Sequence, residues 1–155
     1  MIKQNLIFID NNLSSQESVL EVIVDELFKT KLITDSRVFI DSVMMREEMM
    51  PTSVGLGVAI PHGKSKVVEE PFIAYMRTKN EFEWDHRNGE LVRSIFLIGV
   101  PDVGGDKTHL RYISQISRKL VDQQFRDDLL SCENKEEVFS LLNLINKNIV
   151  KEEKE

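Results

Sequence analysis

The side chains best suited to chemistry in this sequence are its three histidines, and His62 has the most specific surroundings. It follows a short apolar run and lies between Pro61 and Gly63. Pro61 restricts the backbone ahead of the histidine, and Gly63 removes a side chain that would crowd the ring. We therefore expect an exposed imidazole, the side chain best suited to taking up and releasing an electrophile near neutral pH.

His109 follows the pair Gly104-Gly105 and is predicted to open a helix. The positive end of a helix dipole attracts anions and disfavours a protonated ring, so a neutral imidazole there can donate a hydrogen bond to a phosphoryl oxygen. The alternative is an ordinary solvated residue in the first helical turn. His86 lies in a polar turn and is interpreted as a surface residue.

Arg46, His62 and His109 together suggest a site for an anion. One histidine would accept a phosphoryl group, the forked guanidinium of Arg46 would hold its charge, and the other histidine would donate a hydrogen bond. The spacing of these residues along the chain does not show that they meet in space.

Composition limits the class of protein to which the chain belongs. Its 155 residues are 41% hydrophobic and 30% charged, which is typical of one globular domain with its own core. The formal net charge of −6 argues against broad nucleic-acid binding, which needs a basic face. Cys132 is the only cysteine, which excludes an internal disulfide and a thiolate metal cluster.

The sequence also predicts where the protein resides. The longest apolar run, Ile95 to Val100, is far too short to cross a bilayer, and the first residues lack the architecture of a signal peptide. We therefore expect a cytoplasmic protein that has no metal and no cofactor and does not insert into a membrane.

Apolar periodicity predicts the elements of the first half of the chain. Residues 5–10 are predicted to form a strand, followed by a helix with a capping box of Ser14 and Glu17. A second helix is predicted from near Ser36 to before Pro51, with Arg46 in its last turns. The expected apolar faces of these two helices are Val19, Leu20, Ile23, Val24, Leu27 and Phe28, and then Val38, Phe39, Val43 and Met44.

The second half is predicted to contain strands at 72–76 and 94–100, the latter in the middle of the sheet because it is apolar on both faces. A helix capped by Asp106 or Thr108, a short helical turn at 125–130 and a final helix capped by Asn134 should follow. The expected core faces of the two longer helices are Leu110, Ile113, Ser117 and Leu120, and then Val138, Leu141, Leu142 and Ile145. These elements predict one α/β domain over residues 1–150, with helices on both faces of a sheet and a solvated charged tail at 151–155.

The residues around His62 meet the signature of a known family. That signature requires an acidic or amide residue, six free positions, and then aliphatic, small, two free, aliphatic, Ala, aliphatic, Pro, His and Gly positions. It is met by Glu47, Val54, Gly55, Val58, Ala59, Ile60, Pro61, His62 and Gly63. Further matches are Arg46, Lys64, Trp84, His109-Leu110, Phe125-Arg126 and the segment 134–138. On these residues the chain resembles a type 2 enzyme IIA domain (fructose/mannitol class) of the phosphoenolpyruvate-dependent sugar phosphotransferase system (PTS).

This resemblance implies a fold and a chemistry. The fold would be a mixed central sheet flanked by helices. His62 would be phosphorylated on its Nε2 (tele) nitrogen by the phosphocarrier HPr and would pass the group to a cysteine of an enzyme IIB domain, which serves a membrane IIC permease. Arg46 and His109 match the family's phosphate-stabilising positions. Positioning and charge stabilisation suffice for such transfer, so no metal or cofactor is implied.

A partner surface is also implied, because HPr is described as meeting its partners through an apolar patch. Met49, Met50, Val54 and Leu56 would supply a deformable apolar rim near His62. The alternative, favoured by general burial preferences, is that these four residues belong to the core.

Two other functions are compatible with the sequence. In the nitrogen-related branch of the PTS, the same domain is a regulatory phosphoacceptor whose phosphorylation switches protein partners. In a non-phosphorylated relative His62 would be inert, which the intact signature argues against. The segment 46–66, with Trp84, looks closer to the sugar branch. The sugar, the IIB partner and the oligomeric state do not follow from the sequence.

Overall fold

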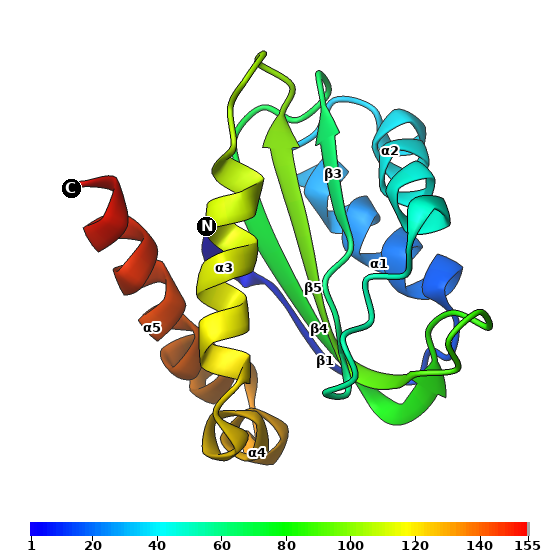
Figure 1. Ribbon diagram of the computed structural model, residues 1–155, viewed down its shortest axis with the longest axis vertical. Coiled ribbons are helices and arrows are strands. Elements are labelled where there is room, and N and C mark those ends of the chain that lie inside the picture. The colour runs from blue at the N-terminus through cyan, green and yellow to red at the C-terminus, as the bar shows by residue number, and fades with distance from the viewer. Residues whose placement is uncertain (155) are drawn as a thin grey trace.

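A five-stranded mixed β-sheet with helices on both faces forms the computed structural model, which describes residues 1–154 (Figure 1). The strands are β1 (Ile2–Asn11), β2 (Val58–Ala59), β3 (His62–Ser65), β4 (Phe72–Glu83) and β5 (Leu91–Pro101). The helices are α1 (Gln16–Lys29), α2 (Ser36–Met49), α3 (Thr108–Leu120), α4 (Gln123–Ser131) and α5 (Lys135–Glu153). The predicted α/β class, with a mixed sheet between two helical layers, is confirmed.

Strand β5 lies in the interior of the sheet, as its apolar sequence predicted. The strand order is β1-β4-β5-β2, and β3 also pairs with β5 beyond β2. β4 and β5 are antiparallel, whereas β1 runs parallel to β4, and β2 and β3 run parallel to β5. Both β4 and β5 are longer than predicted, because the two strands continue to pair as far as Glu83 and Leu91, past the apolar runs on which the prediction rested. This topology leaves β3, which begins at His62, at an edge of the sheet.

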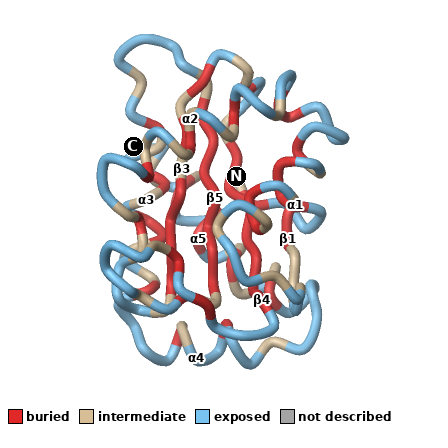
Figure 2. The backbone as a smooth tube through the Cα atoms, turned by 90° about the vertical axis from the view of Figure 1, so that its right-hand side faces the viewer, coloured by how far each residue is buried: buried red, intermediate tan, exposed pale blue. Residues whose placement is uncertain are grey.

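The alternation of side chains along the strands creates two separate cores. In β5, Ile95 and Leu97 pack toward α1 and α2, whereas Phe96 and Ile98 pack toward α3, α4 and α5. Figure 2 shows that the buried backbone is concentrated in the strands, with exposed segments around them. Both faces of the sheet are therefore covered by amphipathic helices.

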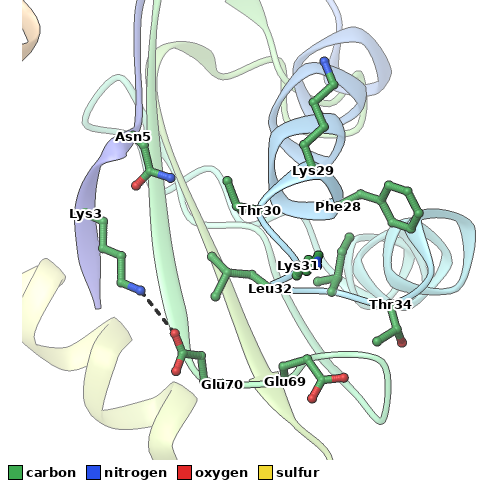
Figure 3. A pocket seen from close by; sticks show the side chains of 11 residues that line it. Lys3, Asn5, Phe28, Lys29, Thr30, Lys31, Leu32, Thr34, Glu69 and Glu70 are labelled. Carbon is green, nitrogen blue, oxygen red and sulfur yellow. Dashed lines mark hydrogen bonds and ion pairs between the residues drawn. The ribbon is translucent and has the colours of Figure 1, made fainter.

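Helix α1 differs from its prediction at both ends. Its N-cap is Ser15, whose hydroxyl oxygen accepts a hydrogen bond from the backbone N–H of Ser18, so the predicted cap at Ser14 is one residue too early. Phe28 is 50% exposed, although it was expected in the core. Its ring points away from β1, beside a hollow of about 1070 Å³ between the start of β1, the end of α1 and residues 69–70 (Figure 3). In the last turn of α1, therefore, Leu27 faces the core and is fully buried, whereas Phe28 faces away from it.

Helices α2 and α5 mostly follow their predictions. In α2, Phe39 and Val43 are buried, but Val38 is 45% exposed. Asn134 caps α5 as expected, since its side-chain oxygen accepts a hydrogen bond from a backbone N–H of the first turn. α5 continues to Glu153, so the helix extends past the expected domain boundary at residue 150. Within residues 1–154, no helix has the length and apolarity that crossing a membrane would require.

Helix α3 is rotated relative to its predicted orientation. Its buried residues are Thr108, Tyr112, Gln115, Ile116 and Leu120, whereas Leu110 is 50% exposed. Of the predicted core face only Leu120 is fully buried. The reason is tertiary: α3 packs beside α5 on the same face of the sheet, and its first turn borders an open groove instead of the core. This rotation places Leu110 on the surface beside His109.

Candidate functional site

The structure brings the three predicted site residues together at the edge of the sheet. His62 is the first residue of β3, Arg46 lies in the last turn of α2, and His109 lies in the first turn of α3. In Figure 1, β3 lies between α2 and α3. The rings of His62 and His109 are stacked, with centroids 6.0 Å apart and an interplanar angle of 28°. All three residues line one open groove of about 780 Å³.

A tight hairpin directly precedes Pro61 and His62. Gly55 and Gly57 have φ angles of +80° and +73°, which favour glycine, and they reverse the chain between residues 52–54 and 58–60. Pro61 then links this hairpin to β3, and its carbonyl accepts a hydrogen bond from the N–H of Ile98 at 3.0 Å. The backbone of His62 is therefore held by the sheet on one side and by the hairpin that precedes it.

The imidazole of His62 is oriented by a backbone carbonyl. Its Nδ1 lies 3.0 Å from the carbonyl oxygen of Ile60. Because a carbonyl can only accept, this contact places the ring proton on Nδ1 and leaves a lone pair on Nε2. Burial lowers the pKa of His62; the charge of Arg46 acts in the same direction, and the hydrogen bond to Ile60 opposes both. The ring is half-buried and neutral at pH 7, which suits Nε2 to act as a nucleophile.

Gly63 serves a different purpose from the one expected. A Cβ atom at this position would lie 2.5 Å from Oγ of Ser42 and 3.0 Å from Cγ2 of Val43. Both residues belong to α2. The glycine therefore allows α2 to pack closely against β3, and does not relieve crowding of the His62 ring.

Arg46 and His109 flank His62 from opposite helices. Nη1 of Arg46 donates a hydrogen bond of 3.0 Å to the carbonyl of Met50, which directs its side chain along the end of α2. Burial lowers the pKa of His109, with further lowering by the nearby His62 and Lys64. Nδ1 of His109 is buried and has no hydrogen-bond partner among residues 1–154. A buried N–H without an acceptor would be costly, so the proton of the neutral ring belongs on Nε2.

Lys64 is a site residue that the sequence analysis mentioned but gave no role. It lies two residues after His62 on β3, and alternate residues of a strand share a face. Its Nζ donates a hydrogen bond of 3.0 Å to the carbonyl of Asp106, just before α3. Asp106 in turn accepts hydrogen bonds from the N–H and hydroxyl of Thr108, but the N-cap of this helix is Lys107, so the predicted cap at Asp106 or Thr108 is off by one residue. Strand periodicity was the signal that would have identified Lys64.

The groove has an exposed apolar rim. Met45, Met49 and Leu110 line it and are 68%, 80% and 50% exposed. The four residues proposed for such a rim, Met49, Met50, Val54 and Leu56, are all exposed, which rules out the alternative that they are core. Only Met49 of these four lines the groove, because the hairpin carries Val54 and Leu56 away from His62.

The third histidine and most other possible metal ligands lie outside the groove. His86 is exposed on its turn and pairs with Glu83. Within the described range 1–154, no group of three or more His, Cys, Asp or Glu side chains is arranged to hold a metal ion.

Comparison with known proteins gives a consistent result. The family model described as "Phosphoenolpyruvate-dependent sugar phosphotransferase system, EIIA 2" matches residues 1–145. The PTS system fructose-like EIIA component of Escherichia coli K12 is 33% identical over 126 residues, covering 81% of this chain and 84% of that protein.

Solved structures share the fold. Nitrogen regulatory protein IIA-Ntr from Neisseria meningitidis has a TM-score of 0.81 and 26% identity, covering 91% of this chain and 95% of that one. Mannitol enzyme IIA of E. coli, in complex with phosphorylated enzyme IIB, has a TM-score of 0.77 and 18% identity, covering 92% and 99%. The match to the family model spans nearly the whole described chain, and the fold agrees with it. The protein therefore belongs to the EIIA 2 family of the phosphoenolpyruvate-dependent sugar phosphotransferase system.

Proposed function

We propose that the protein carries a phosphoryl group on Nε2 of His62. The observation that carries this proposal is the contact of His62 Nδ1 with the carbonyl of Ile60, which leaves Nε2 unprotonated in an open groove. In the forward step the Nε2 lone pair attacks phosphorus, the N–P bond of the donor phosphohistidine breaks, and its electron pair returns to the donor ring, which leaves as a neutral imidazole because its other nitrogen is protonated. The proton on Nδ1 stays in place, so the acceptor needs no separate base.

Arg46 and His109 would stabilise the transferring group. The guanidinium of Arg46 and the Nε2–H of a neutral His109 are donors for phosphoryl oxygens, and both line the groove that holds His62. The charge of Arg46 and the hydrogen bonds from both residues act on the phosphoryl group wherever it lies between donor and acceptor. The reaction therefore depends on positioning and electrostatics more than on covalent catalysis.

The donor would be phospho-HPr and the acceptor a cysteine thiolate of an enzyme IIB domain, which in turn serves a IIC permease. The apolar rim of Met45, Met49 and Leu110 suits a partner that must come close enough for direct transfer. The related mannitol enzyme IIA has been solved with phosphorylated enzyme IIB. We place donor and acceptor on this same rim, one after the other.

A labelling experiment tests the proposal. The protein is incubated with labelled phosphoenolpyruvate, enzyme I and HPr, and the product is examined for acid-labile, base-stable phosphate. We expect label on the wild type and none on His62→Ala, with circular dichroism as the control for folding. Active carriers that leave the wild type unlabelled would overturn the proposed function.

A second candidate is a regulatory phosphoacceptor of the nitrogen-related branch. The structural similarity to IIA-Ntr, at 26% identity, is the observation in its favour. The fructose-like relative at 33% identity favours the sugar branch. Adding membranes with the matching IIB and IIC components decides between them: label that moves on to sugar supports uptake, and label that stays on His62 supports regulation.

A further inference from the structure

A buried carboxylate lies beside the site without taking part in the proposed transfer. Glu47 is the residue after Arg46, and whereas Arg46 lines the groove, Glu47 is only 1% exposed. Its carboxylate accepts hydrogen bonds from the N–H of Thr52 at 3.1 Å, from the hydroxyl of Thr52 and from Nε1–H of Trp84 at 3.2 Å. Burying a carboxylate is costly unless donors surround it, so these three donors fix its position closely.

One line of contacts runs from this carboxylate to His62. The N–H of Ile60 donates to the carbonyl of Thr52 at 3.2 Å across the hairpin. The carbonyl of the same Ile60 is the group that contacts Nδ1 of His62 at 3.0 Å. Thr52, held by Glu47, thus holds the residue that selects the tautomer of the His62 ring.

A second line of contacts runs to Arg46. The chain reverses direction at the end of α2, and the N–H of Thr52 comes two residues after Met50. The carbonyl of Met50 accepts the hydrogen bond from Nη1 of Arg46 at 3.0 Å. By fixing Thr52, Glu47 also fixes the reversal that presents this carbonyl to Arg46.

The turn after β4 also contacts the end of α2. Arg87 is held by Asp85, with Nη2 and Oδ2 2.7 Å apart. Its guanidinium donates to the carbonyl of Glu48 at 2.6 Å and to the carbonyl of Glu47. These are the otherwise unpaired last carbonyls of α2. Trp84 and Arg87 therefore secure the end of α2 together.

We propose that Glu47 is a positioning residue for phosphoryl transfer, acting through Thr52 and Ile60 on the His62 ring and through the chain reversal on Arg46. We call Glu47, Thr52 and Trp84 the Glu47 clamp. The inference rests on the proposed function of His62. It adds the residue that sets the tautomer of the His62 ring and the position of the Arg46 guanidinium. The competing explanation is that the sheet alone places His62, since Pro61 is already bonded to β5.

Two variants separate these explanations. Glu47→Met keeps the length of the side chain but removes the acceptor of all three donors. Thr52→Val keeps the shape and the backbone N–H but removes one donor. Leu142→Ala is the matched control, because Leu142 is fully buried in the other core, on the far face of the sheet. It lowers stability without touching the Glu47 clamp.

The first measurement is the tautomer of His62, read from long-range ¹H–¹⁵N spectra of protein labelled with ¹⁵N-histidine. We expect the Nδ1–H tautomer in the wild type and in Leu142→Ala, and a mixture of tautomers in Glu47→Met. Thr52→Val should show a smaller change in the same direction. If Glu47→Met does not fold, Thr52→Val decides the outcome.

The second measurement is the rate of phosphoryl uptake from phospho-HPr. We expect a loss of roughly 10- to 100-fold in Glu47→Met, the range seen when a group that orients an active imidazole is removed from a metal site. Folded clamp variants with the wild-type tautomer and wild-type rate would overturn the inference. A wild type that takes no label would contradict the proposed function instead, while the tautomer comparison would still test the clamp.

Discussion

His62 and His109 are two neutral imidazoles held close together, and the surroundings of each ring disfavour its positively charged form. Burial is the largest cause for both rings, and neighbouring positive groups act in the same direction. The pairing suits one ring to accept a phosphoryl group through a lone pair and the other to donate a hydrogen bond. Their roles differ because different nitrogens are constrained: a carbonyl contacts Nδ1 of His62, whereas Nδ1 of His109 is buried without a partner.

The lowered pKa values predict a pH dependence. Since both folded pKa values lie below the ordinary value of 6.5, the unfolded chain binds more protons just below pH 6.5 than the folded protein does. Stability from these groups is therefore complete above pH 6.5 and decreases as the pH falls through the folded pKa values. NMR titration should give midpoints below 6.5 for His62 and His109, and Arg46→Met should raise that of His62. An unchanged midpoint in Arg46→Met would show that the guanidinium has no influence on the ring.

A second prediction at this scale concerns His109. His109→Ala should still be phosphorylated on His62 but should transfer the group more slowly, because one donor to the phosphoryl oxygens is lost. Loss of one such donor costs on the order of 10²-fold in comparable sites. Quenched-flow measurement of transfer to the IIB domain tests this, and a wild-type rate would remove His109 from the site.

At the scale of elements, the site depends on how closely α2 approaches β3. Gly63→Ala would place a methyl group against Ser42 and Val43, with Phe39 also only 3.1 Å away. Overpacking of this kind costs about 1–3 kcal/mol, and it should also displace His62. Denaturant unfolding and phosphoryl uptake measure the two effects.

The matched control for this glycine is Gly104→Ala. A Cβ atom there would meet nothing within 4 Å, and its backbone is not in the left-handed region. We expect its stability to stay close to that of the wild type. Equal losses in the two variants would mean that crowding against α2 is not the cause.

The start of α1 gives a further test at this scale. The hydroxyl of Ser15 caps the helix by accepting from the N–H of Ser18 at 3.1 Å. Ser15→Ala should lower the free energy of unfolding by about 1 kcal/mol, whereas Ser14→Ala should change it little. Urea titrations of the two variants distinguish the observed cap from the one the sequence suggested.

At the scale of the whole molecule, the two ends of the chain are joined by a buried amide. The side chain of Asn146, on α5, accepts from the N–H of Ile2 at 3.0 Å and donates to its carbonyl at 2.9 Å. This pair of bonds continues the hydrogen bonding of β1 and attaches α5 to the sheet. It lies in the core on the α5 side, whereas the α2 side of the sheet carries Arg46.

Replacing this amide should affect stability but not chemistry. Asn146→Leu removes both bonds and leaves the backbone N–H and carbonyl of Ile2 buried and unpaired, at a cost of about 1–3 kcal/mol for each group. Thermal unfolding should show the loss, while phosphoryl uptake by the folded protein should match the wild type. A large change in the uptake rate at full folding would link α5 to the site, contrary to this expectation.

The sequence alone determined the α/β class, the interior position of β5 and most core residues of α1, and it singled out His62 as the candidate phosphoacceptor. It could do so because each depends on local patterns: strand and helix periodicity, or residues adjacent to the histidine. Asn134 was recognised as a cap for the same reason. These features need no knowledge of which distant segments meet.

Other features were decided only by the tertiary structure. The rotation of α3, the exposure of Phe28 and the contact of Gly63 with α2 all depend on how separate elements pack. So do the meeting of Arg46 and His109 at His62 and the burial of Glu47 beneath Trp84. Periodicity shows that a helix has an apolar face, but the sheet and the neighbouring helices decide how much of that face is covered.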